Sequence, residues 1–403
     1  MHKRQRAPTA QKVPTADVGT RPSCVLRLVQ NQHVTDIRFR GHAILVRSPH
    51  SDPLTVRFSP QISGPRDHPK KPSHLDSQQS LDLRAGELVE VHSAAEILAT
   101  LDEKGELDSL PFMPEMLQFC GQQLRVSQRA DKTCDTIANN NARRMYRTVH
   151  LEQTRCDGSG HDGCQAGCLL FWKEAWLKRA EARAGGVALV QIKIWNQTNG
   201  NGDDVDPVLN QLLARAARGV DQQGVRYFCQ ATELLRASKP LAWWDARQYL
   251  RDIGTRNVSP AQFLRGCWFA VYAMVRRKLR APRTFPYFGG KLTTTPTERL
   301  DLQPGELVQV KSRTEIYATL DKRSKNRGLY YDVEMWRFSG GIFRVLRRVD
   351  RIVNEKNGRM ITLPNGCVIL DGVYCSGERS THRLFCQRNI LSYWREIWLR
   401  RVT

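Results

Sequence analysis

The sequence predicts an α+β protein in which two duplicated β-rich domains, each an SH3-like barrel or roll with short helices and a zinc site, are joined by a mainly helical middle region. Two observations predict this architecture. A stretch near residue 81 returns near residue 300, and the residues between the two copies carry helical signals. We therefore place the predicted boundaries at 1–80, 81–184, 185–299 and 300–403.

The repeat is read directly from the residues. LDLRAGELVEV at 81–91 returns as LDLQPGELVQV at 300–310. The same displacement carries Glu115 onto Glu334 and Cys156 onto Cys375. After a three-residue insertion, CQAGCLLFWKEAWL at 164–177 corresponds to CQRNILSYWREIWL at 386–399. Similarity at a fixed register over this length indicates an internal duplication.

Each copy is predicted to begin with a strand, because GELVEV and GELVQV alternate apolar and polar residues after a glycine turn. A short helix follows, since Ser93 with Glu96, and Ser312 with Glu315, fit the capping box. Four further segments are predicted strands: QQLRVSQR, TVHLE, GIFRVLRRV and CVILDGVYC. Each copy is then expected to close with an aromatic helix, at 169–179 or 391–401, whose tryptophans pack in the core, with a binding platform as the alternative.

Three cysteines and a histidine lie within CDGSGHDGCQAGC at 156–168. Thiolates and imidazoles are the ligands of tetrahedral zinc, and the glycines of this loop let the chain fold tightly around an ion. The preferred ligands of the first copy are Cys134, Cys156, Cys164 and Cys168. His161 is the reserve ligand, or a hydrogen-bond donor to one of the ligands.

The second copy has lost two of these ligands and gained two others. Val353 stands where Cys134 would map and Ile390 where Cys168 would map. The predicted second set is Cys367, Cys375, His382 and Cys386. Two structural zinc ions are therefore expected, with an iron–sulfur cluster as the alternative for a set of four cysteines and buried structural thiols as the alternative to any metal.

The middle region carries helical signals. VDPVLNQLLARAARGV is a predicted helix, and Ser259 with Gln262 caps another that runs to about Arg280. This second helix is read as a buried interdomain helix, and the alternative is an amphipathic anchor at 260–280 in peripheral contact with a membrane. VALVQIKIW, before these helices, is a predicted strand. Residues 1–80 are predicted to be a largely disordered basic extension, with VLRLV and HAILVRS as short strands.

The formal net charge of +22 favours a polyanionic partner, either nucleic acid or an acidic protein. The leading prediction is a non-enzymatic tandem binding module, because the chain lacks the GxxxxGK[ST], HExxH and GxSxG motifs. A solvated basic face is the alternative account of the cationic side chains. The residues predicted to bind the polyanion are Arg344, Arg347, Arg348, Arg351, Arg276, Arg277 and Lys278.

The N-terminal residues lack the apolar core of a secretory signal, and no apolar run is long enough to span a membrane. A cytoplasmic location is therefore expected. In a reducing compartment, clustered cysteines are better read as metal ligands or reactive thiols than as disulfides.

Four motifs carry a resemblance to a known group: LPFMPEM at 110–116, CDGSGHDGCQAGC at 156–168, CQATELLRASKPLAWWDARQY at 229–249 and YWREIWL at 393–399. On these motifs the chain resembles bacterial proteins that share a duplicated GELVxV…CQ…WxExWL unit, from about residue 80 to the C-terminus. The resemblance implies an intact tandem unit. It also implies an alternative function, a metal- or thiol-dependent enzyme or accessory subunit in a polysaccharide or secondary-metabolite pathway.

Overall fold

The computed structural model describes residues 80–402 apart from 139–140, 181–205, 222–223, 280–288 and 381, together with one hairpin nearer the N-terminus. The chain divides into two compact units, Met1–Pro72 and Ser73–Thr403. In the first unit, β1 (Asp36–Phe39) pairs antiparallel with β2 (His42–Leu45), which confirms a strand within HAILVRS. VLRLV, VALVQIKIW and the disorder predicted for the first 80 residues lie outside the described residues.

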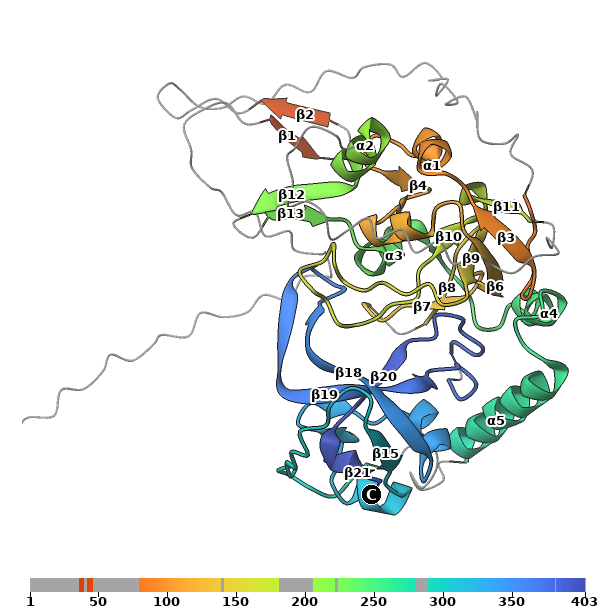
Figure 1. The fold of residues 1–403 in the computed structure, drawn as a ribbon. Coiled ribbons are helices and arrows are strands. Elements are labelled where there is room, and N and C mark those ends of the chain that lie inside the picture. Colours follow the sequence, from red (N-terminus) through yellow and green to blue (C-terminus); the bar gives the residue numbers. More distant parts are fainter. Residues whose placement is uncertain are drawn as a thin grey trace, which may run out of the picture. The chain divides into compact units, whose positions relative to one another are not determined.

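The second unit is a mixed α+β structure with several small antiparallel sheets (Figure 1). The first five-stranded sheet has the order β10-β9-β6-β3-β11 and the second has the order β20-β19-β18-β15-β21. The strands occupy the same places in both, and the sheets as described are open, with no closed barrel. Their bounds are β3 (Leu88–Val91), β6 (Gln123–Arg129), β9 (Thr148–Leu151), β10 (Trp172–Lys173) and β11 (Leu177–Arg179), then β15 (Leu307–Val310), β18 (Ile342–Val353), β19 (Met360–Tyr374), β20 (Leu391–Trp394) and β21 (Leu399–Arg401).

The connection between the first two strands of each sheet also repeats. Helix α1 (Ala94–Thr100) and helix α6 (Arg313–Tyr317) both begin with the predicted capping box, with Ser93 N donating to Glu96 Oε2 over 2.8 Å and Ser312 N to Glu315 Oε2 over 2.9 Å. Each is followed by a two-stranded ribbon and a 3-10 helix. These are β4 (Glu106–Leu107), β5 (Leu110–Pro111) and η1 (Pro114–Phe119), then β16 (Lys325–Asn326), β17 (Leu329–Tyr330) and η3 (Val333–Phe338).

The prediction of aromatic helices at 169–179 and 391–401 is wrong. Each segment is instead a strand, a single 3-10 turn and another strand, with η2 (Glu174–Trp176) between β10 and β11 and η4 (Glu396–Trp398) between β20 and β21. The extended residues form both edges of their sheet, which a continuous helix could not do. Core packing of the tryptophans is nevertheless confirmed, because Trp172, Trp176, Trp394 and Trp398 are all fully buried.

The second copy differs in its central hairpin. Strands β18 and β19 have 12 and 15 residues, whereas β6 and β9 have 7 and 4. The longer hairpin extends to the first copy's cysteine loop (Figure 1), where Gln165 N donates to Arg351 O over 3.1 Å and Asp350 N donates to Gln165 Oε1 over 2.6 Å. The two copies therefore contact each other through backbone hydrogen bonds.

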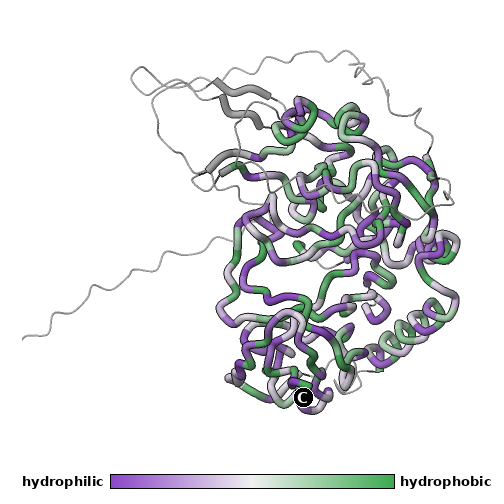
Figure 2. Tube along the Cα trace, viewed as in Figure 1, coloured by the Kyte–Doolittle hydropathy of each residue, from purple (hydrophilic) through white to green (hydrophobic). Residues whose placement is uncertain are grey.

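The described part of the middle region is mainly helical, with two small β elements. The last helix, α5, packs on the second copy through Phe263, whose ring lies 5.7 Å from that of Phe385. Figure 2 shows hydrophobic residues recurring along α5, and Leu264 and Trp268 are each 68% exposed. The elements are α2 (Pro207–Ala216), β12 (Ala217–Asp221), β13 (Gly224–Tyr227), α3 (Gln230–Ala237), α4 (Arg247–Gly254) and α5 (Pro260–Lys278), with β14 (Lys239–Pro240) joining β7 (Thr133–Cys134) and β8 (Ala142–Arg144) in a separate sheet.

Helix α5 is thus only partly the buried interdomain helix that the sequence predicts. None of the helices within the described ranges has the length and apolar character needed to cross a membrane.

A buried lysine joins three parts of this unit. Lys132 Nζ, in the first copy, donates to Asp252 Oδ2 of α4 over 2.6 Å and to Leu384 O of the second copy over 2.8 Å. Gln387 Nε2 donates to the other carboxylate oxygen of Asp252 over 2.9 Å. Both members of the ion pair are nearly inaccessible to solvent, so each charge depends on the other for its stability.

Replacing Lys132 by alanine should therefore lower the free energy of unfolding by about 3–5 kcal/mol, because Asp252 would be left as an uncompensated buried carboxylate. Lys311→Ala is the matched control, since Lys311 pairs with Glu298 over 3.0 Å in a more exposed position and its loss should change stability by less than about 1 kcal/mol. Urea denaturation of both variants measures the difference. If Lys132→Ala and Lys311→Ala lower the free energy of unfolding equally, Lys132 does not stabilise the contact of the three parts.

Candidate metal and anion sites

The cysteine loop of the first copy is closed at its base. Cys156 N donates to Cys168 O over 2.8 Å, and Leu170 N donates to Thr154 O over 3.1 Å. Within the loop, Gly158 has a φ of +83°, and a Cβ on it would lie 2.0 Å from the carbonyl oxygen of Cys164. Only glycine fits there, so the loop brings the residue-158 backbone directly against Cys164.

The second copy contains the same loop. Cys375 N donates to Ile390 O over 2.9 Å, and a Cβ on Gly377 would lie 2.5 Å from the backbone nitrogen of Cys386. These contacts join the residues that the repeat alignment equates with those of the first loop. The pair Cys156 and Cys164 thus has its counterpart in Cys375 and Cys386.

A buried glutamate holds each loop. Glu115 Oε1 accepts hydrogen bonds from Gly160 N over 3.1 Å, from His161 Nδ1 over 2.6 Å and from Cys156 Sγ over 3.5 Å. Its other oxygen, Oε2, is buried and has no hydrogen-bond partner within the described residues.

In the second copy, Glu334 accepts from Arg379 N over 2.6 Å and from the hydroxyls of Ser376 and Ser380 over 3.1 and 3.2 Å. Ser380 occupies the position that corresponds to His161.

His161 forms a buried ion pair with Glu115 when its ring is protonated. Its Nδ1 faces the carboxylate, and its Nε2 lies 3.3 Å from the carbonyl oxygen of Phe228, so both ring nitrogens face acceptors. Burial alone would lower the pKa of His161, but the hydrogen bond to Glu115, with a smaller contribution from Asp162, raises it above its ordinary value. Burial is the largest single influence and would raise the pKa of Glu115, but the hydrogen bond and charge of His161, together with backbone hydrogen bonds including that of Gly160, lower this pKa overall.

A small cavity of about 20 Å³ lies between this loop and the start of α3. Its lining includes the thiol-bearing residues Cys156, Cys164, Cys168 and Cys229, together with His161. Cys229 was not among the predicted ligands, because an isolated cysteine beside apolar residues reads as core. The sequence signal that could have found it is its place inside the CQATELL motif.

Among the described residues, one group brings three potential ligand atoms within 4.8 Å of one another. It consists of Glu115, Cys156 and His161, all buried. Two of the other predicted ligands, Cys164 and Cys168, line the adjacent cavity. Cys164 Sγ also accepts a hydrogen bond from Val353 N of the second copy over 3.3 Å.

Cys134 lies elsewhere, with the cysteines of the second copy. Its thiol hydrogen-bonds with Cys386, and Arg388 Nη1 donates to its carbonyl oxygen over 3.2 Å. The hydrogen bond with Cys386, together with Arg388 and Arg383, lowers the pKa of Cys134 to about 6 despite its burial. The predicted first set is therefore divided, because the strand that carries Cys134 faces the second copy.

The predicted second set is divided as well. Cys367 is buried in a small core with Val349 and Ile369, and its thiol points to the carbonyl oxygen of Val349 over 3.7 Å. His382 is exposed, with its ring edge-on to Trp243 at 6.3 Å. Only Cys375 and Cys386 remain together in the second loop.

The arginines predicted to bind a polyanion occupy several environments. Arg348 Nη1 pairs with Glu396 over 3.0 Å and with Asp301 over 3.3 Å, as the buried Arg129 pairs with Glu174 in the first copy over 2.6 Å. Arg348 is thus engaged in ion pairs within its own copy, and the alternating pattern of β18 concealed this because the partners come from η4 and from the segment before β15.

The other predicted cationic residues lie in three places. Arg344 Nη1 donates to Gly305 O over 2.7 Å. Arg347 and Arg351 lie against glycines of the 156–168 loop. On α5, Arg276 lies over the ring of Tyr272, Lys278 is exposed, and the side chain of Arg277 is outside the described part of the chain.

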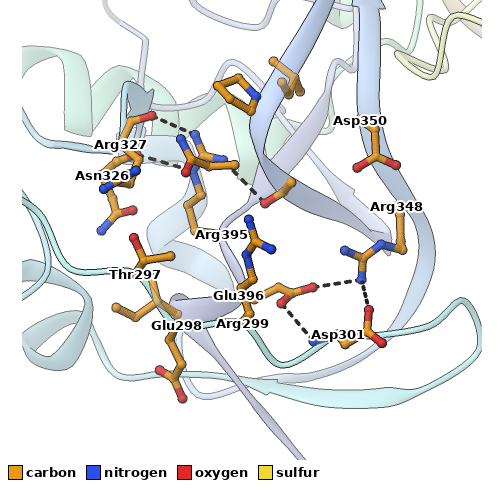
Figure 3. A pocket seen from close by; sticks show the side chains of 15 residues that line it. Thr297, Glu298, Arg299, Asp301, Asn326, Arg327, Arg348, Asp350, Arg395 and Glu396 are labelled. Carbon is orange, nitrogen blue, oxygen red and sulfur yellow. Dashed lines mark hydrogen bonds and ion pairs between the residues drawn. The ribbon is translucent and has the colours of Figure 1, made fainter.

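A cavity of about 450 Å³ in the second copy is not strongly cationic (Figure 3). Its four arginines are matched by four carboxylates. Figure 3 shows Arg348 directed at Glu396 and Asp301, and Arg395 directed at backbone carbonyls. The charged lining residues are Arg299, Arg327, Arg348, Arg395, Glu298, Asp301, Asp350 and Glu396.

A smaller cleft of about 250 Å³ is cationic. Three segments form it: the cysteine loop with His161, the β12–β13 hairpin with α3, and the tip of the β18–β19 hairpin. Its charged lining consists of three arginines, His161 and one carboxylate, Asp162, whose Oδ2 lies 3.8 Å from Arg226 Nε. The arginines are Arg218, Arg226 and Arg359.

No protein-family model, curated protein or solved structure matches this chain. By its structure the protein belongs to the α+β class and contains two open five-stranded sheets with equivalent strand order. Its function is inferred from its own residues and their geometry.

His161→Gln should destabilise the protein by about 3–5 kcal/mol at pH 6, because it removes one charge of a buried pair. The histidine, whose folded pKa is raised, contributes stability fully below its ordinary pKa of about 6.5 and loses it as the pH rises through the folded value. The glutamate, whose folded pKa is lowered, contributes stability at pH values above its ordinary pKa of about 4.5. The loss should therefore be largest between about pH 4.5 and 6.5 and should shrink at higher pH.

Urea denaturation at several pH values measures this difference. His92→Gln is the matched control, because His92 pairs with Glu96 over 3.3 Å at a more exposed position and should change stability by less than about 1 kcal/mol. A loss for His161→Gln that stays constant from pH 5 to 9 would contradict the imidazolium assignment.

Proposed function

We propose that this protein is a non-enzymatic tandem binding module, stabilised by a metal, that binds nucleic acid or another polyanion. We also propose that each copy is an SH3-like roll. The support is a five-stranded antiparallel sheet whose fourth and fifth strands, at its two edges, are joined by a 3-10 turn in both copies. Such a scaffold presents loops at its ends, and loops carried on rigid sheets are where binding residues concentrate.

The observation that carries the binding proposal is the cationic cleft. Arg218, Arg226 and Arg359 converge from two hairpins onto one opening of about 250 Å³, opposite a single lining carboxylate. Guanidinium groups present planar donors that match the oxygens of a phosphate, so this arrangement suits phosphate better than an isolated carboxylate. The long β18–β19 hairpin completes the cleft by bringing in Arg359.

Aromatic rings beside these arginines favour single-stranded nucleic acid among the polyanions. Tyr227 lines the cleft, and the guanidinium of Arg218 lies 5.9 Å from the ring centroid of Phe228. Single-stranded chains are commonly bound by a basic groove that follows the backbone, with aromatic rings that stack on bases. An acidic protein segment would use the arginines but would have no use for a stacking surface.

The alternative is a metal- or thiol-dependent enzyme, or an accessory subunit in a biosynthetic pathway. Burial raises the pKa of the Cys156 and Cys229 thiols and raises that of Cys168 to about 11. Thiols in that state are poor nucleophiles at neutral pH. These groups suit a structural role better, which favours the binding module.

Binding of a labelled single-stranded oligonucleotide should weaken with salt, and Arg359→Ala and Arg218→Ala should each reduce the slope of log K against log salt by about 0.7, the contribution of one phosphate contact. Fluorescence anisotropy over roughly 50–200 mM salt measures the slope. Arg344→Ala is the control, because Arg344 is exposed on β18 and does not line the cleft. If only Arg344→Ala changes the slope, the binding surface lies on β18 and not in the cleft. If the wild type does not bind the oligonucleotide, the proposed function is wrong.

A further inference from the structure

We propose that the first copy binds a single zinc ion through Cys156, Cys164, Cys168 and Cys229, and that this ion fastens the start of α3 to the cysteine loop. The inference rests on the metal-stabilised module proposed above and specifies its ligands. It departs from the sequence-based set by replacing Cys134 with Cys229, and from the expectation of two ions by assigning one.

The cavity between the loop and α3 has the size and lining that such an ion requires. Its volume of about 20 Å³ exceeds the roughly 10–15 Å³ that holds one water molecule, so it has room for one ion and for no organic cofactor. Four cysteines complete a tetrahedral shell and leave no open position, as in structural zinc sites. No three of these sulfurs lie within 4.8 Å of one another in the structure, so ligation at about 2.3 Å requires them to move inward from the cavity wall.

Each of the four residues is held in place by backbone contacts. Cys156 and Cys168 are joined at the base of the loop, and Cys164 is held against Gly158. Val353 N donates to Cys164 Sγ over 3.3 Å, a contact that strengthens when the sulfur is a thiolate. Cys229 is the N-cap residue of α3, and its carbonyl oxygen accepts from Thr232 N and Glu233 N over 3.1 Å, which fixes its backbone at the start of the helix.

The second copy shows which of these features are specific to the site. Its loop keeps Cys375 and Cys386 but has Ile390 where Cys168 stands in the first loop. The middle region that supplies Cys229 is not duplicated, and the further thiol beside Cys386 is that of Cys134 from the first copy. The second loop therefore gathers three thiols where the first gathers four, and we assign the single ion to the first loop.

The competing ligand set, Glu115 with Cys156 and His161, is better explained as a clamp. In the second copy the same glutamate position holds the same loop through Ser380 in place of a histidine. The clamp therefore positions the loop without contributing a ligand.

Zinc content of the purified full-length chain, measured by inductively coupled plasma mass spectrometry, tests the proposal. One zinc per chain is expected for the wild type, and Cys229→Ser should lose it. Three variants should keep it: Cys134→Ser, Cys267→Ser and His161→Ser, the last of which introduces the residue that the second copy has. Cys229→His should restore binding, because histidine is also a zinc ligand.

Cobalt substitution of the wild type supplies a second measurement that does not depend on a variant folding. Four thiolate ligands give an intense sulfur-to-cobalt charge-transfer absorption. Ligation by Glu115, Cys156 and His161 would give the weaker absorption of a single sulfur ligand. Retention of zinc by Cys229→Ser, loss of zinc from Cys134→Ser or His161→Ser, or a single-sulfur spectrum would each overturn the ligand set. A wild type without zinc would also overturn the ligand set. The binding function is tested separately by the salt dependence of oligonucleotide binding, so it can stand even if the zinc proposal fails.

Discussion

The ammonium group of Lys132 is the contact on which the assembly of the larger unit depends. A buried charge of this kind is tolerated only where fixed acceptors surround it, and here the acceptors come from α4 and from the second copy. Shape alone would let the two sheets meet in many orientations. The requirement to satisfy one buried ammonium restricts these orientations, together with hydrogen bonds between the copies such as those of Arg388 and Asn389.

Comparison of the two copies separates the scaffold from the sites built on it. The capping boxes, the glutamate that clamps each loop and the arginine–glutamate pair at 129 and 174, repeated at 348 and 396, all persist. These contacts satisfy buried or terminal backbone groups, so either copy would be weakened by their loss. The two copies differ in their cysteines and in the length of their central hairpin. The candidate metal and anion sites both lie at the cysteine loop of the first copy, where these differences occur.

The sequence predicted those features that are local and failed on those that depend on distant segments. Strands and capping boxes follow from neighbouring residues, and the repeat supplied each of them twice. The tryptophans four positions apart suggested a helix, but a strand–turn–strand places both rings in the same core equally well. Grouping Cys134 with Cys156 assumed that each copy folds alone. The structure instead sets Cys134 against Cys386 and brings Cys229 to the first loop, contacts that residue spacing within one copy does not encode.

The reach of the β18–β19 hairpin bears on the order in which this chain folds during synthesis. The backbone groups at residues 350–353 that complete the surroundings of Gln165 and Cys164 leave the ribosome nearly two hundred residues after them. Until then the first loop lacks the cover that this hairpin supplies, which leaves its thiols more open to adventitious ions and oxidants. A nascent chain of this protein therefore passes through a long interval before that side of the loop is shielded.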